Sequence, residues 1–222
     1  MMDEKTKKLV TMAMLCALSY VVMFVGRFPL VPAVGFLTYD PKDVIIVIGG
    51  FLYGPLESFL ISLIVSLVEM VTASDTGPIG LIMNILSTCA FACTAAFIYK
   101  KLHTIRGAVI GLIGGCAAMA AVMMLWNYLI TPIYMGYPRD VIAGMLLPAF
   151  LPFNLIKGGL NAAITIFLYK PAVKALRAAK LVPESKGESA AGKGKISIGA
   201  TILALAVLAT CVIIVLVFQG II

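Results

Sequence analysis

Charged residues are scarce in this chain of 222 residues: Asp, Glu, Lys and Arg make up 12% of it, against about 25% in typical soluble domains. Apolar residues make up 62%, and the mean hydropathy is +1.08. A soluble fold of this length could not cover so much apolar surface with so few charges. The composition therefore argues against a soluble enzyme and predicts an integral membrane protein whose solvent is lipid.

Residues that build catalytic and metal centres are also few. The chain has one histidine, His103, and five cysteines, all of which lie in hydrophobic stretches. Cys89 and Cys93 share a helix face, but no histidine or second cysteine pair completes a metal site. Residues 187–193 match most of a phosphate-binding loop, yet Gly194 stands where Ser or Thr is required. We expect no metal, no cofactor and no ATP hydrolysis by this chain.

Basic residues exceed acidic ones, giving a net charge of +7, but their placement does not suggest a nucleic-acid surface. Of the 17 Lys and Arg residues, only Lys157 falls deep inside an apolar segment, and the others lie at segment ends or in connections. A nucleic-acid-binding protein would gather them into one patch. We interpret them as topology signals and expect no nucleic-acid partner.

Long apolar runs, separated by breaks that contain Pro and Gly, predict the fold. The runs are 9–25, 44–53, 55–72, 79–99, 108–130, 145–169 and 196–218. A spanning helix needs about 20 apolar residues, and the second run is shorter than this. The expected class is all-α, a polytopic membrane helix bundle with a six-helix domain in 1–180, a flexible cytoplasmic linker in 181–195 and one additional transmembrane helix in 196–222.

Positive charge sets the expected orientation. With the N-terminus in the cytoplasm, the inner segments collect most Lys and Arg residues, and the outer loops hold only Arg27, Lys42 and Arg139. This asymmetry follows the positive-inside rule with an even number of helices before the linker. We therefore expect a multi-pass protein of the cell membrane with a cytoplasmic N-terminus.

Polar side chains inside the apolar segments mark candidate sites, because lipid penalises them unless they face a cavity or a partner. Asn154, Lys157 and Asn161 are spaced three and four residues apart, which places them on one helix face. A polar stripe in 55–72 ends at Glu69. One interpretation is interhelical bonding, including a Glu69–Lys157 ion pair. The other is a polar pocket that opens outward, which accounts better for Lys157.

Such a pocket would bind a small polar ligand. Glu69, Asn84, Asn127 and Lys157 all lie toward the outer side, and Asn127, Asn154 and Lys157 would present amide and ammonium groups to the ligand. The first loop is placed to cover the pocket. Flat apolar walls are expected from four aromatic residues, Trp126, Tyr128, Phe150 and Phe153.

Several short motifs form one pattern when they are taken together. They are LTYD at 37–40 with Asp43, FLYGP at 51–55, Gly77-Pro78 with Asn84, WNY at 126–128 with Pro132 and Tyr134, and PFNLIKG at 152–158. In order and spacing over residues 6–178, they resemble the substrate-binding S components of energy-coupling factor (ECF) vitamin transporters, most closely the riboflavin-specific members. The linker and the last helix depart from the pattern of the usual six-helix members.

The resemblance implies a subunit that captures riboflavin from outside and delivers it inward with a transmembrane coupling subunit and two separate ATPase subunits. Family binding positions map onto Asn127 and Lys157, and the first loop would supply contacts and a lid through Leu37 to Asp40. Asn84 and Glu69 are further candidates, for the hydroxyl groups of the ribityl chain. Riboflavin would be the transported ligand and not a cofactor.

Ala13 and Ala17 on the first helix resemble the family's Ala-x-x-x-Ala, through which the coupling subunit packs closely. The alternative is that these small residues pack within the chain. Other functions also stay open at this point: an S component for another vitamin or for flavin mononucleotide (FMN), an intramembrane enzyme, or a structural membrane protein. Glu69 with Lys157 is the only candidate acid–base pair for an enzyme.

Overall fold

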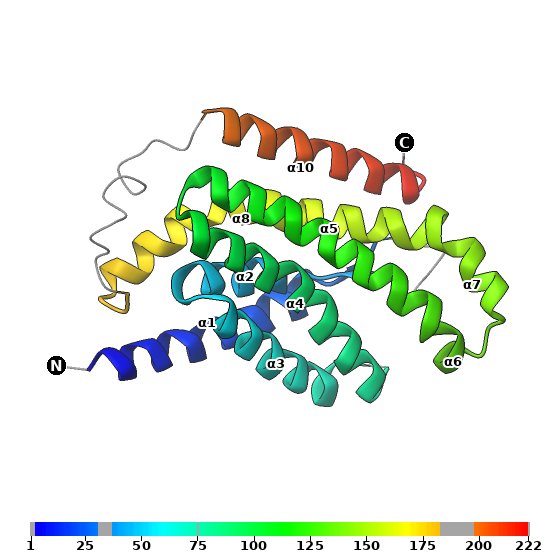
Figure 1. Cartoon of the computed structure of the whole chain (residues 1–222), viewed down its shortest axis with the longest axis horizontal. Coiled ribbons are helices and arrows are strands. Elements are labelled where there is room, and N and C mark those ends of the chain that lie inside the picture. Colours follow the sequence, from blue (N-terminus) through cyan, green and yellow to red (C-terminus); the bar gives the residue numbers. More distant parts are fainter. Residues whose placement is uncertain (1–2, 31–36, 75, 183–197, 222) are drawn as a thin grey trace.

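The computed structural model describes residues 3–30, 37–74, 76–182 and 198–221, which are almost entirely helical (Figure 1). In chain order the elements are α1 (Glu4–Gly26), β1 (Phe28–Pro29), β2 (Thr38–Tyr39), α2 (Lys42–Tyr53), α3 (Pro55–Thr72), α4 (Gly77–Leu102), α5 (Ile105–Leu129), α6 (Thr131–Met135), α7 (Arg139–Met145), the π-helix η1 (Leu146–Phe150), α8 (Leu151–Ala178) and α10 (Ile198–Phe218).

Six helical stretches in the described part of the chain are long and apolar enough to cross a membrane: α1, α3, α4, α5, the continuous run Arg139–Ala178, and α10. α2 has 12 residues, fewer than the roughly 17–25 that a spanning helix needs. Ten residues of α2 are buried, so its neighbours and not lipid enclose it. The predicted all-α membrane bundle is confirmed: five long stretches and the enclosed α2 form the core, and α10 is added to it.

The predicted helix boundaries are close where Gly and Pro set them and shifted elsewhere. α3 matches the predicted segment 55–72, because Gly54 ends α2 with a φ of 118° and Pro55 takes the first turn of α3. The sixth segment, predicted at 145–169, runs from Arg139 to Ala178. A π-helical turn accommodates Pro148, so the helical run continues through this proline and begins at Arg139, upstream of the predicted start at Met145.

Two predicted loops contain regular structure. In the first, β1 pairs with β2 as an antiparallel hairpin, with Phe28 opposite Tyr39. Residues 31–36 of this loop lie outside the described part. In the second, predicted at 131–140, α6 is followed by the start of α7. The hairpin lies directly before α2, so its position determines where the first residues of α2 point.

α4 and α5 pack closely because two glycines of α5 face α4. A Cβ atom at Gly111 would lie 2.7 Å from the carbonyl oxygen of Ala95, and one at Gly115 would clash with the carbonyl oxygen of Phe91. The G-x-x-x-G spacing of these residues therefore brings two backbones together within the bundle.

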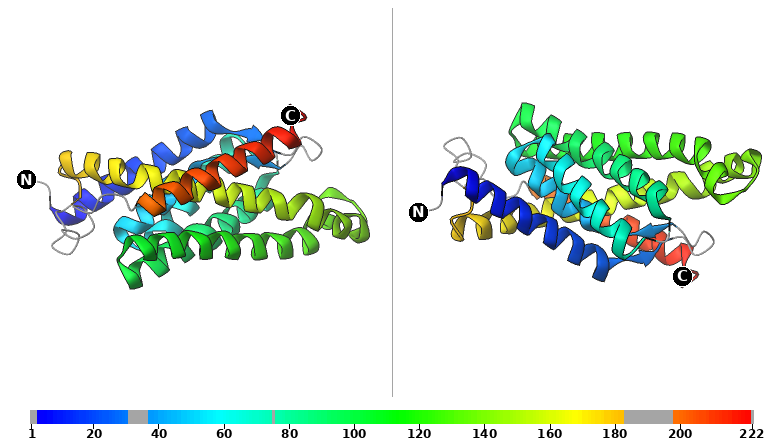
Figure 2. Two further views of the ribbon diagram at one scale, coloured as in Figure 1. Left: turned by 90° about the horizontal axis from the view of Figure 1, so that it is seen from above. Right: turned by 90° about the horizontal axis from the view of Figure 1, so that it is seen from below.

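α10 runs along α8 in the opposite direction (Figures 1 and 2). Its buried residues are Ala204 and Cys211, and a Cβ atom at Gly159 of α8 would lie 3.0 Å from Cys211 Sγ. α10 ends at the end of the bundle opposite to the start of α1. The linker predicted at 181–195 falls almost entirely on residues outside the described part.

Candidate ligand-binding site

A cavity of about 160 Å³ lies beside the hairpin, between α3, α4, α5 and α8. All seven side chains predicted to bind a ligand line it: Leu37, Asp40, Glu69, Asn84, Asn127, Asn154 and Lys157. They come from five places in the chain, namely the hairpin segment, α3, α4, α5 and α8, and only the fold brings them together. The other described lining residues are Arg27, Thr38, Ser74, Thr76, Met83, Ser87, Met123, Tyr134 and Phe153.

Lys157 is buried on α8 beside two carboxylates. Its Nζ atom donates a hydrogen bond to Asp40 Oδ2 at 3.2 Å and lies 3.9 Å from Asp43 Oδ2. Asp43 also accepts hydrogen bonds from Thr88 at 2.7 Å and from Asn161 Nδ2 at 3.2 Å. The ammonium group is therefore neutralised by the residues that lead into and begin α2.

Asn161 ties the hairpin to α8. The hydroxyl of Tyr39 donates to Asn161 Oδ1 at 2.9 Å, and Asn161 in turn donates to Asp43. The three polar residues of the predicted α8 face therefore all have a role. Asn154 and Lys157 line the cavity, and Asn161 holds the hairpin that covers it.

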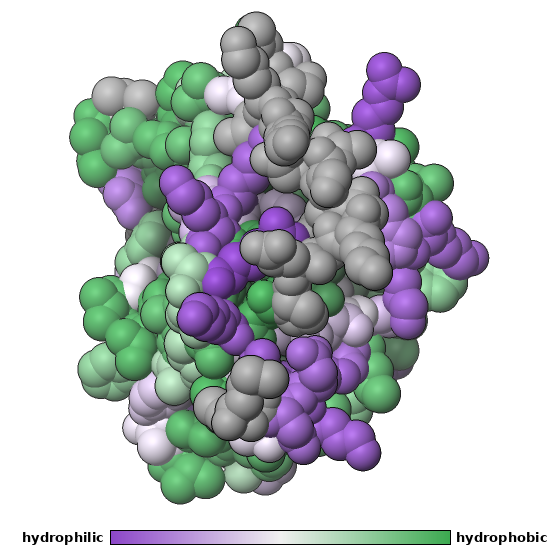
Figure 3. Space-filling model, turned by 90° about the vertical axis from the view of Figure 1, so that its left-hand side faces the viewer, coloured by the Kyte–Doolittle hydropathy of each residue, from purple (hydrophilic) through white to green (hydrophobic). Residues whose placement is uncertain are grey.

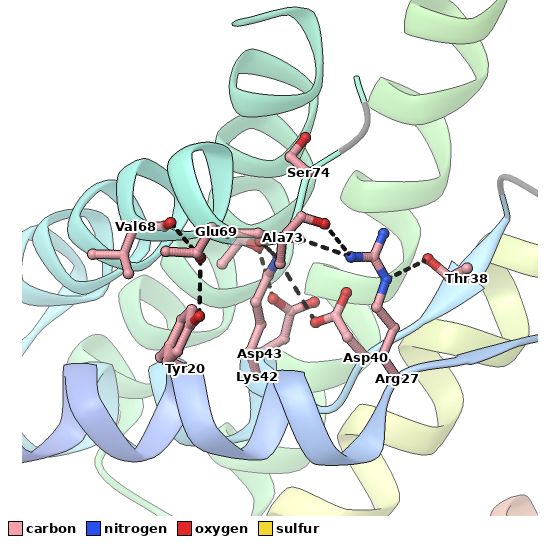
Figure 4. Close-up of polar contacts among 12 residues, drawn as sticks. Tyr20, Arg27, Thr38, Asp40, Lys42, Asp43, Val68, Glu69, Ala73 and Ser74 are labelled. Carbon is pink, nitrogen blue, oxygen red and sulfur yellow. Dashed lines mark hydrogen bonds and ion pairs between the residues drawn. The ribbon is translucent and has the colours of Figure 1, made fainter. Parts of the chain in front are cut away.

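Lys42 does not lie where the sequence predicts. It was expected as a charge of the outer loop, but it is the first residue of α2 and its side chain is fully buried. Its Nζ atom donates to Glu69 Oε2 at 2.5 Å and lies 3.8 Å from Asp40 Oδ1 (Figure 4). The hypothesis of a Glu69–Lys157 ion pair is therefore wrong. The signal that was missed is that Lys42 and Asp43 directly precede a wholly apolar run, which draws the first turn into the core.

Arg27, expected only as a charge of the outer loop, is a residue of the site as well. From the end of α1 it reaches three partners: the carbonyl oxygen of Ala73 at 3.1 Å, Thr38 Oγ1 at 3.3 Å and Glu69 Oε1 at 4.0 Å (Figure 4). It thereby joins α1, the hairpin and the end of α3 at the rim of the cavity.

The two asparagine amides are held in fixed orientations. Asn127 Nδ2 donates to the carbonyl oxygen of Met123 at 2.7 Å, and its Oδ1 accepts from Thr131 at 2.9 Å. Asn154 Nδ2 donates to the carbonyl oxygen of Phe150 at 2.8 Å. Because an amide has two N–H groups and two lone pairs on its oxygen, each side chain keeps capacity to donate and to accept.

Of the four expected aromatic walls, only Phe153 lines the cavity. Phe150 is buried in a separate cluster, Tyr128 is 39% exposed with the Arg139 guanidinium 5.7 Å from its ring, and Trp126 packs against the main core. The helical rotation of α5 turns Asn127 inward, so its neighbours in sequence point elsewhere. Tyr134, noted in the sequence only as part of a motif, lines the cavity.

Charge in and around the cavity is balanced. Three carboxylates (Asp40, Asp43, Glu69) and three cations (Arg27, Lys42, Lys157) lie within 4.0 Å of one another in pairs. Burial alone would raise the pKa of the Asp40 carboxyl, but Lys157 and Lys42 outweigh it and hold that pKa below its usual value. Asp40 is therefore a carboxylate at neutral pH.

Ala13 and Ala17 lie on the exposed face of α1, whereas the buried residues of that helix are Thr11, Leu15, Ser19 and Met23. The alternative that the two alanines pack within the chain is therefore wrong. Their contact with a coupling subunit stays a prediction.

Within the described residues, no group of three His, Cys, Asp or Glu side chains is placed to hold a metal ion.

The chain is similar to proteins of known function. A family model for the substrate-specific component of ECF transporters matches residues 7–169. The riboflavin transporter FmnP of Bacillus subtilis (strain 168) is 30% identical over 189 residues, which cover 80% of this chain and 99% of that protein. The riboflavin transporter RibU of Staphylococcus aureus (strain TCH60) is 29% identical over 173 residues, 75% of this chain and 90% of that protein.

The fold is similar to a solved structure as well. The S component of a bacterial ECF transporter superposes with a TM-score of 0.66 at 29% identity, covering 78% of this chain and 98% of that chain. Together with the membrane-spanning helices, these similarities make the chain a multi-pass membrane transport protein and not an enzyme. It belongs to the family of substrate-specific components of ECF transporters.

Proposed function

We propose that this chain is the riboflavin-binding subunit of an ECF-type vitamin uptake transporter. The observation that carries the proposal is that seven side chains singled out in the sequence surround one cavity. The relatives named above, which are riboflavin transporters, support the choice of ligand.

The chemistry of the lining suits a flavin. Riboflavin has a flat apolar ring system, an edge of carbonyl and imide groups, and a hydroxylated chain. Asn127 keeps one N–H and one lone pair for such an edge, and Lys157 donates only. Phe153, Leu37 and Met123 offer apolar surface for the ring, while Asn84, Ser87 and Thr76 offer partners for hydroxyl groups.

Charge balance favours riboflavin over FMN. Each cation that lines the described part of the cavity, Arg27 or Lys157, already lies within 4.0 Å of a carboxylate. A phosphate would have to compete with Asp40 or Glu69 for these groups, whereas a neutral ribityl chain would not. We therefore expect FMN to bind more weakly.

Binding requires the lining to move apart. The cavity holds about 160 Å³, and sites for small molecules commonly hold about 300–1,000 Å³. The hairpin is the element best placed to move, because it covers the cavity and is not part of a spanning helix. Polar contacts from Tyr39 to Asn161 and from Lys157 to Asp40, and the burial of Leu37 and Tyr39 beside Phe150 and Phe153, hold it in the closed position. Ligand contacts with Leu37 and Asp40 would then hold the hairpin closed.

The proposed orientation places the hairpin outside and the start of α1 in the cytoplasm. Lys42 no longer counts as a loop charge, since it is buried, which leaves Arg27 and Arg139 on the outer side. The inner ends of α1, α4 and α8 carry most of the remaining Lys and Arg residues, as the positive-inside rule requires. Riboflavin would enter from outside and be delivered inward.

Delivery would need further subunits. The chain has no phosphate-binding loop, so ATP would be hydrolysed by two separate ATPase subunits that act through a transmembrane coupling subunit. The exposed small residues Ala13 and Ala17 would let a helix of the coupling subunit approach α1 closely.

Titration of the purified full chain with riboflavin tests the proposal, because a flavin that is enclosed by the protein loses fluorescence. We expect saturable quenching at a 1:1 ratio, weaker quenching with FMN, and none with the double variant Asn127→Leu/Lys157→Met. Lys5→Met, an exposed lysine on α1, is the matched control and should bind normally. Absence of quenching at micromolar riboflavin would overturn the assignment of the ligand.

A further inference from the structure

A second and larger cavity, about 410 Å³, lies away from the site described above. It runs between the first half of α5 and the second half of α8, and Ala200 of α10 adds to its wall. The α5 side is wholly apolar: Ile105, Ala108, Val109 and Leu112 share one helix face. None of the seven predicted ligand-binding residues lines this cavity, which we call the α5–α8 groove.

The groove has the dimensions of one lipid leaflet. On α8 its lining extends from Thr165 to Arg177, about 18 Å at the helical rise of 1.5 Å per residue. The hydrocarbon of one leaflet is about 15 Å thick. The wall toward the core is aromatic: the Phe51 and Tyr99 rings lie 4.5 Å apart, and the hydroxyl oxygens of Tyr99 and Tyr169 lie 3.1 Å apart.

Basic side chains line one end of the groove. Lys170, Lys174 and Arg177 follow at spacings of four and three along α8, so they share a face. No acidic residue is among the described residues that line the groove. This is the end of the molecule where α1 begins, and there hydrophilic side chains gather around an apolar centre (Figure 3).

We propose that the α5–α8 groove binds one anionic phospholipid, with an acyl chain along the apolar lining and the phosphate at Lys170, Lys174 and Arg177. The chain spans a membrane, so lipid always surrounds it, and basic residues near a headgroup attract anionic lipid. Ala200 lies outside residues 7–169, the part of the chain that matches the family model. α10 therefore adds to the groove a wall residue that the matched part of the chain does not contain.

Native mass spectrometry of the full chain in detergent tests the proposal. With dioleoyl phosphatidylglycerol we expect one retained lipid per protein, and at least about tenfold weaker retention of dioleoyl phosphatidylcholine. Lys170→Gln/Lys174→Gln/Arg177→Gln should abolish the preference between the two lipids. Val109→Trp, which fills the groove, should reduce retention of both, and Ala108→Leu is the milder filling if the tryptophan lowers the unfolding temperature.

The matched control removes three charges at the same end of the molecule but outside the groove: Lys5→Gln/Lys101→Gln/Lys180→Gln, all at exposed positions. It should retain the lipid preference. Equal retention of both lipids by the unaltered chain would overturn the proposal, and so would an equal loss in the control. Displacement of phosphatidylglycerol by millimolar inorganic phosphate would also overturn it, because the phosphate alone would then be the ligand.

Discussion

Lys157 Nζ lies 3.2 Å from Asp40 Oδ2, and this contact joins the middle of the bundle to the residue between β2 and α2. Both side chains are more than nine-tenths buried. A buried ion pair contributes little net stability, but the loss of one partner leaves an uncompensated charge. Binding and stability therefore depend on this pair in different ways, and variants can separate the two.

Lys157→Met should lower riboflavin affinity by at least about 30-fold, because truncating one member of a buried charge pair costs about 2–5 kcal/mol. It should also destabilise the chain by about 3–5 kcal/mol, since the buried Asp40 loses its nearest cation and keeps only Lys42, 3.8 Å from its other oxygen. Fluorescence titration and thermal unfolding measure the two effects. In the double variant Asp40→Asn/Lys157→Met we expect stability to recover and binding to stay lost. Recovery of both would mean that Lys157 serves only to neutralise Asp40.

Lys42 and Glu69 should be more important for stability than any exposed pair. Lys42→Met or Glu69→Gln alone should destabilise by about 3–5 kcal/mol, because the remaining group is buried without its partner. The double variant Lys42→Met/Glu69→Leu should recover most of this loss. Glu4→Gln, which removes the exposed partner of Lys7 at 3.9 Å, is the control and should cost at most about 0.5 kcal/mol. If thermal unfolding shows that Lys42→Met destabilises the chain no more than Glu4→Gln does, the buried Lys42–Glu69 pair is not important for stability.

Riboflavin binding should be insensitive to pH from 8 down to 5. The pKa of Asp40 is lowered in the folded chain, so its carboxylate stabilises the fold at every pH above the ordinary value of 3.8. That contribution is lost only as the pH falls through the lowered folded value. The measurement is the dissociation constant from flavin quenching across this range. A tenfold loss of affinity between pH 7 and pH 5 would show that one of the two carboxylates beside Lys157 is not held ionised, either Asp40 or Asp43, whose pKa is raised by burial.

Gly115→Ala should destabilise the bundle by about 1–3 kcal/mol, because its new methyl group would meet backbone of α4 that cannot move aside. Gly144→Ala is the matched control: it lies in α7, and a Cβ atom there meets nothing within 4 Å. The control should leave the unfolding temperature equal or slightly higher, since Ala favours helix over Gly. Equal effects of the two substitutions would show that α4 and α5 are not in backbone contact.

Ala13→Leu/Ala17→Leu should leave riboflavin binding unchanged and prevent uptake in cells that contain the other transporter subunits. Both alanines are exposed on α1, so larger side chains would block only a partner helix. Ala117→Leu/Ala121→Leu on α5 has the same spacing and exposure and should support normal uptake. If both double variants transport equally well, α1 does not carry the coupling surface.

The sequence alone determined the class of the protein and identified seven of the sixteen described residues that line the cavity as candidates for ligand binding. Hydropathy and Gly/Pro breaks are local properties, so they predicted the bundle and the boundary between α2 and α3. Helical periodicity is local too, and the spacing of Asn154, Lys157 and Asn161 was enough to place them on one face. Polar side chains are unfavourable in lipid, so a polar helix face was expected to point toward a cavity.

The tertiary structure alone decided which charges pair. The sequence allowed an ion pair between Glu69 and Lys157. In the structure α2 is enclosed by the bundle, so Lys42 pairs with Glu69 and Lys157 pairs with Asp40. Likewise the rotation of α5 directs Asn127 inward and Trp126 away from the cavity. Such choices depend on the angles and distances between helices far apart in the chain. No local pattern encodes them, because the distance between two charges is set by the packing of every helix between them.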